Sequence, residues 1–194
     1  MRCYAYSLLF LTDGPTYGLH LNIGDASKTL IWSPLDDADF EGFPANVPTQ
    51  TTQAGGGIKI LGAGIGSPDV IRSYASARVA KIAAIIERLP TLDDVQLQYL
   101  FLKYCAGMPR MNFQLRVCHP DILDTVITEF DELMYDGIHA LFGNRPLSLD
   151  DLFRIHLPIT KSGFGISLGK YIATPAHLGS IFDSLELQCQ ILLS

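Results

Sequence analysis

The sequence predicts an α+β domain that is mostly helical, in which short N-terminal β elements precede a bundle of about five helices. Apolar and polar residues alternate at 19–22 and 29–32, and a period of two is typical of strands. From residue 67 onward, apolar residues recur at helical spacing between serines, threonines and prolines that favour helix starts. We therefore expect a β-containing segment at 1–66 and a helical domain at 67–194.

The N-terminal segment is expected to contain strands separated by one long loop. The loop, at 33–57, holds three prolines, four acidic residues and a run of glycines, and a loop of this length is usually functional or mobile. A short strand at 58–62 then leads into the glycine-rich segment 63–66, where a tight hairpin is expected.

Helix-start and helix-stop residues divide the C-terminal part into helices. Ser67 is a suitable N-cap because proline and aspartate follow it. We expect helices at 68–89, 92–106, 120–143, 149–156 and 175–192, with a turn or strand at 157–166. The caps assigned to the second and fourth helices are Thr91 with Asp94 and Ser148 with Asp151.

Composition places the chain among globular proteins. Of its 194 residues, 48% are hydrophobic and 18% charged, and the longest uncharged apolar run is shorter than the ~20 residues a bilayer helix needs. The apolar run before Thr12 resembles a signal peptide but has no small-residue cleavage site after it. We expect an intracellular protein, cytoplasmic or nuclear, without a membrane partner, and secretion is the alternative.

The net charge of −6, from 20 acidic and 14 basic side chains, opposes strong nucleic-acid binding, because phosphate neutralisation needs a basic surface. The four cysteines never form a C-x-x-C pair, so reduced thiols are expected rather than a metal site. The five histidines are scattered, and the acidic residues offer no pair suited to two metal ions. We assign no catalytic residue, no metal ligand and no cofactor to this chain.

Two features leave alternatives open. Gly62, Gly64 and Gly66 lie where a phosphate loop would lie between strand and helix, but they lack the spacing of GxGxxG and a following Lys-Ser/Thr, so we favour a structural or backbone-contact hairpin over nucleotide binding. The hypothesis that the chain is a small-molecule enzyme depends on this glycine loop alone. The basic residues of the first long helix either contact a phosphate backbone or form its solvated side; they are Arg72, Arg78, Lys81 and Arg88.

Five blocks, in order, resemble retrotransposon reverse transcriptases of the plant and algal type. Residues 13–22 (DGPTYGLHLN), with Lys28-Thr29 and Ile31-Trp32-Ser33-Pro34, resemble the family's DGPxYGLxLN–KTE–FWP block. The other matching blocks are 57–62 (GIKILG), 92–107 (LDDVQ with FLKYCAG), 113–120 (FQLRVCHP) and 157–166 (LP with SGFGI). The resemblance covers about residues 13–185. It departs at three extra residues before Lys28, at Leu30 in place of a glutamate, and at Ser162 in place of a glycine.

The resemblance implies the end of a polymerase palm, a primer-grip-like hairpin and thumb-like helices. The family's catalytic aspartates, which bind Mg²⁺ in the full-length parent, correspond to a region upstream of residue 1. We therefore expect a truncated or relic fragment, not an active enzyme by itself, that binds RNA template and DNA primer weakly or joins an upstream polymerase segment. The residues implied to contact nucleic acid are Lys28, Lys59, Gly62, Gly64, Gly66, Arg72, Arg78 and Lys81. The alternative is a non-catalytic helical protein-interaction module derived from that fold.

Overall fold

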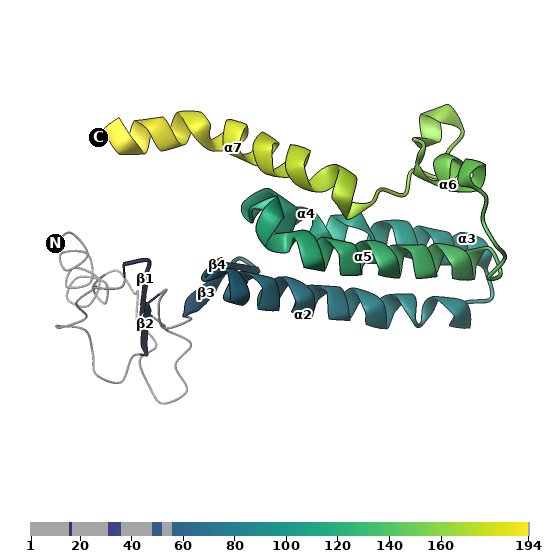
Figure 1. Ribbon diagram of the computed structural model, residues 1–194, viewed down its shortest axis with the longest axis horizontal. Coiled ribbons are helices and arrows are strands. Elements are labelled where there is room, and N and C mark those ends of the chain that lie inside the picture. Colours follow the sequence, from purple (N-terminus) through teal and green to yellow (C-terminus); the bar gives the residue numbers. More distant parts are fainter. Residues whose placement is uncertain (1–15, 17–30, 36–47, 52–55, 194) are drawn as a thin grey trace. The chain divides into compact units, whose positions relative to one another are not determined.

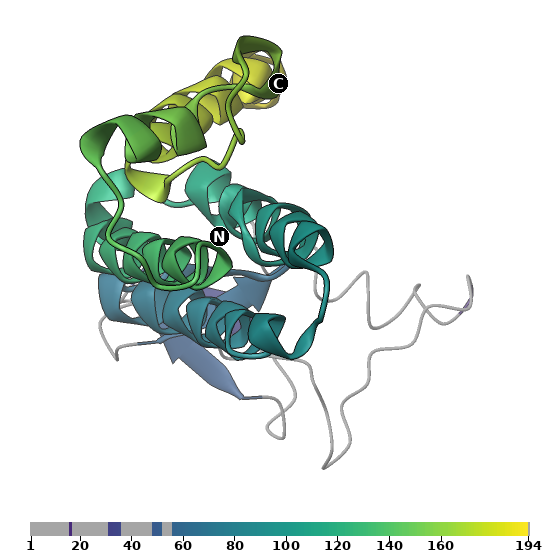
Figure 2. The ribbon, with the colours of Figure 1, turned by 90° about the vertical axis from the view of Figure 1, so that its right-hand side faces the viewer.

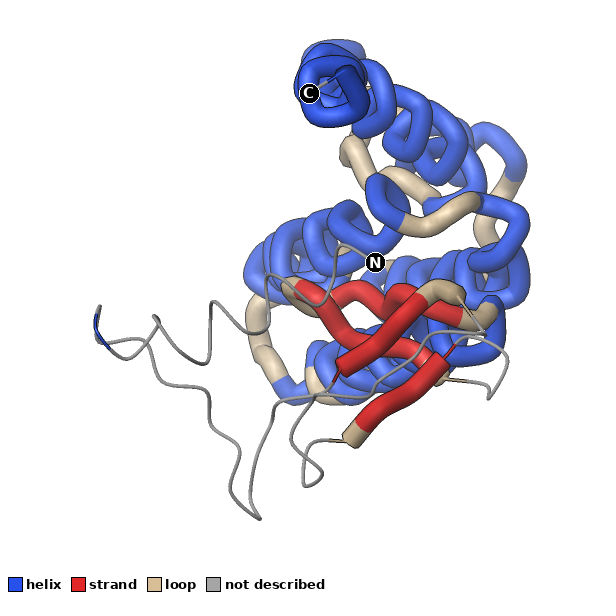
Figure 3. Tube along the Cα trace, turned by 90° about the vertical axis from the view of Figure 1, so that its left-hand side faces the viewer, coloured by secondary structure: helices blue, strands red, loops and turns tan. Residues whose placement is uncertain are grey.

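A computed structural model describes residues 16, 31–35, 48–51 and 56–193 of the chain, with the side chains of the last three of these left undescribed. The chain falls into two compact units. The first comprises residues 1–58 and 65–70, and the second comprises 59–64 and 71–194. Helices are the main element of the described residues, and strands are short, so the prediction of a mostly helical α+β chain is confirmed (Figures 1 and 3).

The first unit contains a pair of short parallel strands. β1 (Ile31–Ser33) pairs with β2 (Thr49–Thr51), and Trp32 lies opposite Gln50. The strand at β1 was predicted, but β2 lies inside the segment predicted to be loop. The three residues Thr-Gln-Thr carry no apolar alternation, and their hydrogen-bond partner is distant in sequence, so no local pattern indicated this strand. Lys28 and most of the loop at 33–57 lie outside the described residues.

The predicted hairpin is present. β3 (Gly57–Ile60) and β4 (Ala63–Gly66) form a two-stranded sheet. Leu61 and Gly62 connect them with φ values of 51° and 101°, and positive φ at both central residues is the pattern of tight hairpin turns. The turn therefore brings the end of β3 directly back to the start of β4.

Helices account for most of the second unit. α2 is Pro68–Ile86, and the structure then shows α3 (Val95–Leu100), a π-helix at Phe101–Ala106, α4 (Met108–Val117), α5 (Pro120–Leu141), α6 (Leu149–His156) and α7 (Gly169–Leu193). Short 3₁₀ turns lie at Leu89–Thr91 and Ile159–Lys161. Figure 2 shows α2 and α5 stacked, with α6 and α7 on the side of α5 that faces away from α2.

Apolar side chains from successive helices form one core. Ile82, Leu102 and Phe130 are each fully buried. At Gly137 of α5 a Cβ atom would lie 2.7 Å from Leu102 Cδ1 and 3.3 Å from Ile86 Cγ2. This glycine therefore lets α5 approach the side chains of α2 and of the π-helix closely.

Polar caps set several helix boundaries. The Ser67 hydroxyl accepts a hydrogen bond from Val70 N at 3.4 Å, and Ser148 forms a capping box with Asp151, as predicted. The cap of α3 is Asp94, whose Oδ1 accepts from Gln96 N at 2.7 Å. Thr91 instead donates to Arg88 O within a 3₁₀ turn, so its assignment as a cap was wrong.

Two other helix predictions were wrong. α4 was not predicted, because Gly107 and Pro109 indicated only a helix end, whereas proline is also favoured in a first helical turn. α7 begins at Gly169 rather than at Pro175 because Asp131 of α5 caps it: Oδ1 accepts from Gly169 N at 2.5 Å and Oδ2 from Lys170 N at 3.1 Å. This cap comes from a distant element and has no local sequence signal.

None of the helices in the described residues is both long enough and apolar enough to cross a bilayer.

Candidate phosphate-binding site

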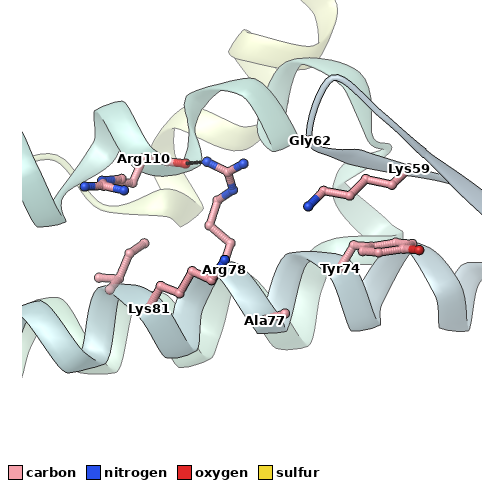
Figure 4. A pocket seen from close by; sticks show the side chains of 8 residues that line it. Lys59, Gly62, Tyr74, Ala77, Arg78, Lys81 and Arg110 are labelled. Atoms are coloured by element: carbon pink, nitrogen blue, oxygen red, sulfur yellow. Dashed lines mark hydrogen bonds between the residues drawn. The ribbon is translucent and has the colours of Figure 1, made fainter. Parts of the chain in front are cut away.

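Four basic residues line one pocket of about 210 Å³ in the second unit. We call it the basic pocket. The residues that line it are Lys59, Gly62, Tyr74, Ala77, Arg78, Lys81, Ile82 and Arg110. They come from the β3–β4 hairpin, α2 and α4, and Figure 4 shows Arg78 between Lys59 on one side and Arg110 on the other.

Helix α2 supplies one wall. Tyr74, Arg78 and Lys81 are four and three residues apart, so helical periodicity places them on a common face. Ile82, which is fully buried, anchors this stretch in the core. The same periodicity that buries Ile82 therefore directs the basic side chains into the pocket.

The hairpin supplies the opposite wall and is held by a buried amide. Gln114 Nε2 of α4 donates to the carbonyl oxygen of Gly62 at 2.9 Å, and Gln114 is only 1% exposed. A Cβ at Gly62 would lie 2.9 Å from the Arg78 guanidinium. The absence of a side chain at Gly62 thus allows both the positive φ of the turn and the close approach of the Arg78 guanidinium. Lys59 Nζ lies 5.8 Å from the centre of the Tyr74 ring, a cation–π contact across the pocket.

The two arginines are oriented by backbone carbonyls. Arg78 Nη1 donates to the carbonyl oxygen of Arg110 at 3.4 Å, and Arg110 Nε donates to that of Cys105 at 2.9 Å. Cys105 lies in the last turn of the π-helix, where carbonyls without intrahelical partners are expected. Each guanidinium uses part of its donor set for this and retains other N–H groups for a ligand.

The basic pocket carries concentrated positive charge. Within the described part of the chain, the structure records no ion pair for any of the two lysines and two arginines of the pocket, in contrast to Arg116, which pairs with Asp183. The chain as a whole has a net charge of −6. Like charges gathered without counter-charges repel one another, and an anionic ligand relieves that repulsion.

The structure brings together some of the residues that the sequence singled out. Lys59, Gly62, Arg78 and Lys81 line the basic pocket. The three other predicted residues within the described part do not line it: Arg72 is on α2, Gly64 is buried in β4, and Gly66 ends β4. Lys28 lies outside the described residues.

Arg110 and Gln114 were not predicted as site residues. Both belong to α4, the helix that the sequence did not indicate, and helical spacing would have placed them one turn apart. A start signal at Met108-Pro109 was available in the sequence, since proline favours a first helical turn. The described residues include no group of three or more His, Cys, Asp or Glu side chains that could hold a metal ion.

No family model matches this chain, and neither the curated proteins nor the solved structures give a match.

Proposed function

We propose that this chain is a non-catalytic domain derived from a retroelement reverse transcriptase, and that its basic pocket binds phosphate groups of nucleic acid. One observation carries the proposal: Lys59, Arg78, Lys81 and Arg110 line a single pocket, and the described chain records no carboxylate partner for them. The order of the sequence blocks supports the origin. By that resemblance the hairpin and helices would lie beside an RNA–DNA duplex.

Binding is expected to be weak. Phosphate contacts provide most of the affinity of non-specific binding, and each needs a cation. The basic pocket offers four cations, while the rest of the chain is acidic enough to give a net charge of −6. We expect dissociation constants of about 10⁻⁴–10⁻⁶ M, as for non-specific binders at physiological salt.

Fluorescence anisotropy with a labelled RNA–DNA duplex at low salt tests the proposal. The Lys59→Ala/Lys81→Ala variant removes two exposed pocket lysines and should weaken binding several-fold. Lys161→Ala/Lys170→Ala removes two exposed lysines from elsewhere in the second unit and should change it little. Undetectable binding, or equal losses in both variants, would contradict a pocket-based function.

A protein-interaction module is the second candidate, favoured by the exposed apolar side chains of α7. Phe182 is 70% exposed and Leu187 60% exposed, and Leu178, Ile181 and Leu185 are also exposed. Exposed apolar side chains clustered on one element are typical of protein contacts. If the chain binds no duplex but associates with another protein, and Phe182→Ser abolishes that association, this second function replaces the first.

A further inference from the structure

The shape of the basic pocket distinguishes among phosphate ligands. Its volume is about 210 Å³. It is smaller than the ~300–1,000 Å³ of typical small-molecule sites. A phosphate group or a short polyphosphate therefore fits inside, while an attached nucleoside remains outside.

Base recognition is not built into the pocket. Tyr74 is the aromatic residue of the lining, and Lys59 Nζ lies 5.8 Å from its ring centre. The remaining lining residues are basic, glycine or aliphatic. The lining has no carboxylate to accept from cytosine and no amide side chain to pair with adenine, and backbone carbonyls already occupy part of the donor sets of Arg78 and Arg110. The ligand is therefore recognised through its charge.

The cations of the basic pocket are clustered and are not arranged in a row that could follow the phosphates of a strand. Arg88 lies in the turn after the end of α2 and lines a separate depression with Leu89, Leu92 and Phe101. Arg72 precedes Arg78 by six residues, does not line the basic pocket and already has another interaction. An internal phosphodiester carries one negative charge, and successive phosphates need cations distributed along the strand.

A terminal phosphate matches this arrangement better. A phosphomonoester carries about −1.5 to −2 charges near neutral pH, and a polyphosphate carries more. Charge-assisted hydrogen bonds from several cations to one anion are the strong kind. Arg78 and Arg110 are already oriented by backbone carbonyls, so they lose less freedom when they bind.

We propose, on the basis of the proposed phosphate-binding function, that the basic pocket selects densely charged phosphate groups, namely the terminal monophosphate or polyphosphate of a polynucleotide, over internal phosphodiesters. Lys59 and Lys81 approach the anion from opposite walls, and Arg78 contacts it from the middle of the pocket. The same chemistry is available in a free nucleotide. Nucleobase identity should make no difference to affinity.

The test uses the full chain and one short, 3′-labelled RNA prepared with a 5′-hydroxyl, a 5′-monophosphate or a 5′-triphosphate end. Anisotropy titrations without divalent ions give three affinities, and unlabelled tripolyphosphate, ATP and GTP serve as competitors. We expect the 5′-triphosphate RNA to bind about tenfold or more tightly than the 5′-hydroxyl RNA, as additional charged hydrogen bonds would give. ATP and GTP should compete equally.

Variants locate the effect. Lys59→Ala/Lys81→Ala should abolish the preference for the 5′-phosphorylated ends. Arg78→Lys should reduce this preference, because lysine lacks the planar guanidinium that donates two parallel hydrogen bonds to one phosphate. Arg88→Ala and Lys161→Ala/Lys170→Ala should leave it unchanged. Thermal unfolding followed by circular dichroism confirms that each variant is folded.

The outcomes separate this inference from the function on which it rests. Equal binding of all three RNAs, lost in the pocket variants, would overturn the selection of terminal phosphates and leave backbone binding intact. Binding of tripolyphosphate and ATP without binding of any RNA would support the dense-anion ligand and overturn the nucleic-acid function. If neither RNA nor free polyphosphate binds, both proposals are wrong.

Discussion

Asp131 is a buried carboxylate whose two oxygens accept hydrogen bonds from the first backbone amides of α7. Burial raises the pKa of this carboxyl, because desolvation disfavours its charged form. The hydrogen bonds from Lys170 and Gly169, and the charges of Lys170 and His156, oppose that rise. One side chain therefore fixes the start of α7 and has a pKa that differs between the folded and unfolded states.

The sign of the resulting pH dependence follows from linkage. A carboxyl whose pKa is higher in the folded than in the unfolded state makes the folded protein bind more protons. Its contribution to the free energy of unfolding is then present at acid pH and is lost as pH rises through the raised pKa. We predict that Asp131→Asn removes this component, so that the difference in unfolding free energy between wild type and variant changes with pH. Urea titrations from acid to neutral pH measure it. A constant difference across that range would contradict the prediction.

Gly62 offers a second test at the residue scale. Its φ of 101° is a conformation that L-residues rarely adopt, and an added Cβ would lie 2.9 Å from the Arg78 guanidinium. We predict that Gly62→Ala destabilises the chain by about 1–2 kcal/mol and weakens phosphate binding by displacing Arg78. Gly179, in helix α7, has open space around its Cβ position, so Gly179→Ala should be neutral or stabilising. Urea denaturation and anisotropy measure both effects; an unchanged Gly62→Ala variant would show that the turn is not constrained.

At the scale of elements, α2 joins the core to the basic pocket. Ile82 is fully buried in the core and also lines the pocket. We predict that Ile82→Ala lowers the free energy of unfolding by about 2–5 kcal/mol, a large part of a typical domain's ~5–15 kcal/mol. Leu187 on α7 is 60% exposed, and Leu187→Ala should cost little. Equal costs in denaturant titrations would mean that α2 is not part of the principal core.

Elements with strong local signals could be predicted from the sequence, and elements defined by distant partners could not. Ser67 and the pair Ser148 and Asp151 stand beside helical periodicity, so those starts were found. The start of α7 depends on Asp131, which is 38 residues away. β2 depends on pairing with β1. In both cases the stabilising contact is tertiary, so the secondary-structure propensities of the local residues do not predict it.

Part of the candidate site could likewise be predicted from the sequence. Arg78 and Lys81 lie on a helix with clear periodicity, and Lys59 lies in a hairpin that the glycines indicated. Arg110 lines the same pocket because α4 packs against α2 and the hairpin, through Arg78 and the Arg110 carbonyl and through Gln114 and the Gly62 carbonyl. The sequence spacing of basic residues alone left their role open, because a solvated face has the same pattern.

At the scale of the whole molecule, the net charge of −6 and the basic pocket act in opposite directions. A net negative charge slows association with a polyanion at long range, whereas a local cluster of cations favours it at short range. Salt screens charges separated by more than ~10 Å at 0.1 M. For the proposed phosphate binding we therefore expect short-range capture rather than long-range steering along a duplex.

Polymerase activity is not expected of the chain alone. Nucleotide addition needs carboxylates that hold two metal ions against the primer and the departing phosphate, and the resemblance places the family's catalytic aspartates outside the blocks that match this chain. We predict no template-dependent incorporation with Mg²⁺ or Mn²⁺ in a primer-extension assay. Incorporation that disappears when one of the chain's own aspartates or glutamates is mutated would show that a catalytic site exists.

The salt dependence of nucleic-acid binding tests the central claim most directly, because its slope reports the number of phosphates that the protein neutralises. Log affinity falls with log salt by about 0.9 per phosphate contact on a DNA duplex and about 0.7 on single strands. We predict a shallow slope for the wild type, corresponding to a few contacts, and a slope smaller by about one or two contacts in Lys59→Ala/Lys81→Ala. The Lys161→Ala/Lys170→Ala variant should retain the wild-type slope. A wild-type slope that the pocket variant leaves unchanged would contradict phosphate binding at the basic pocket.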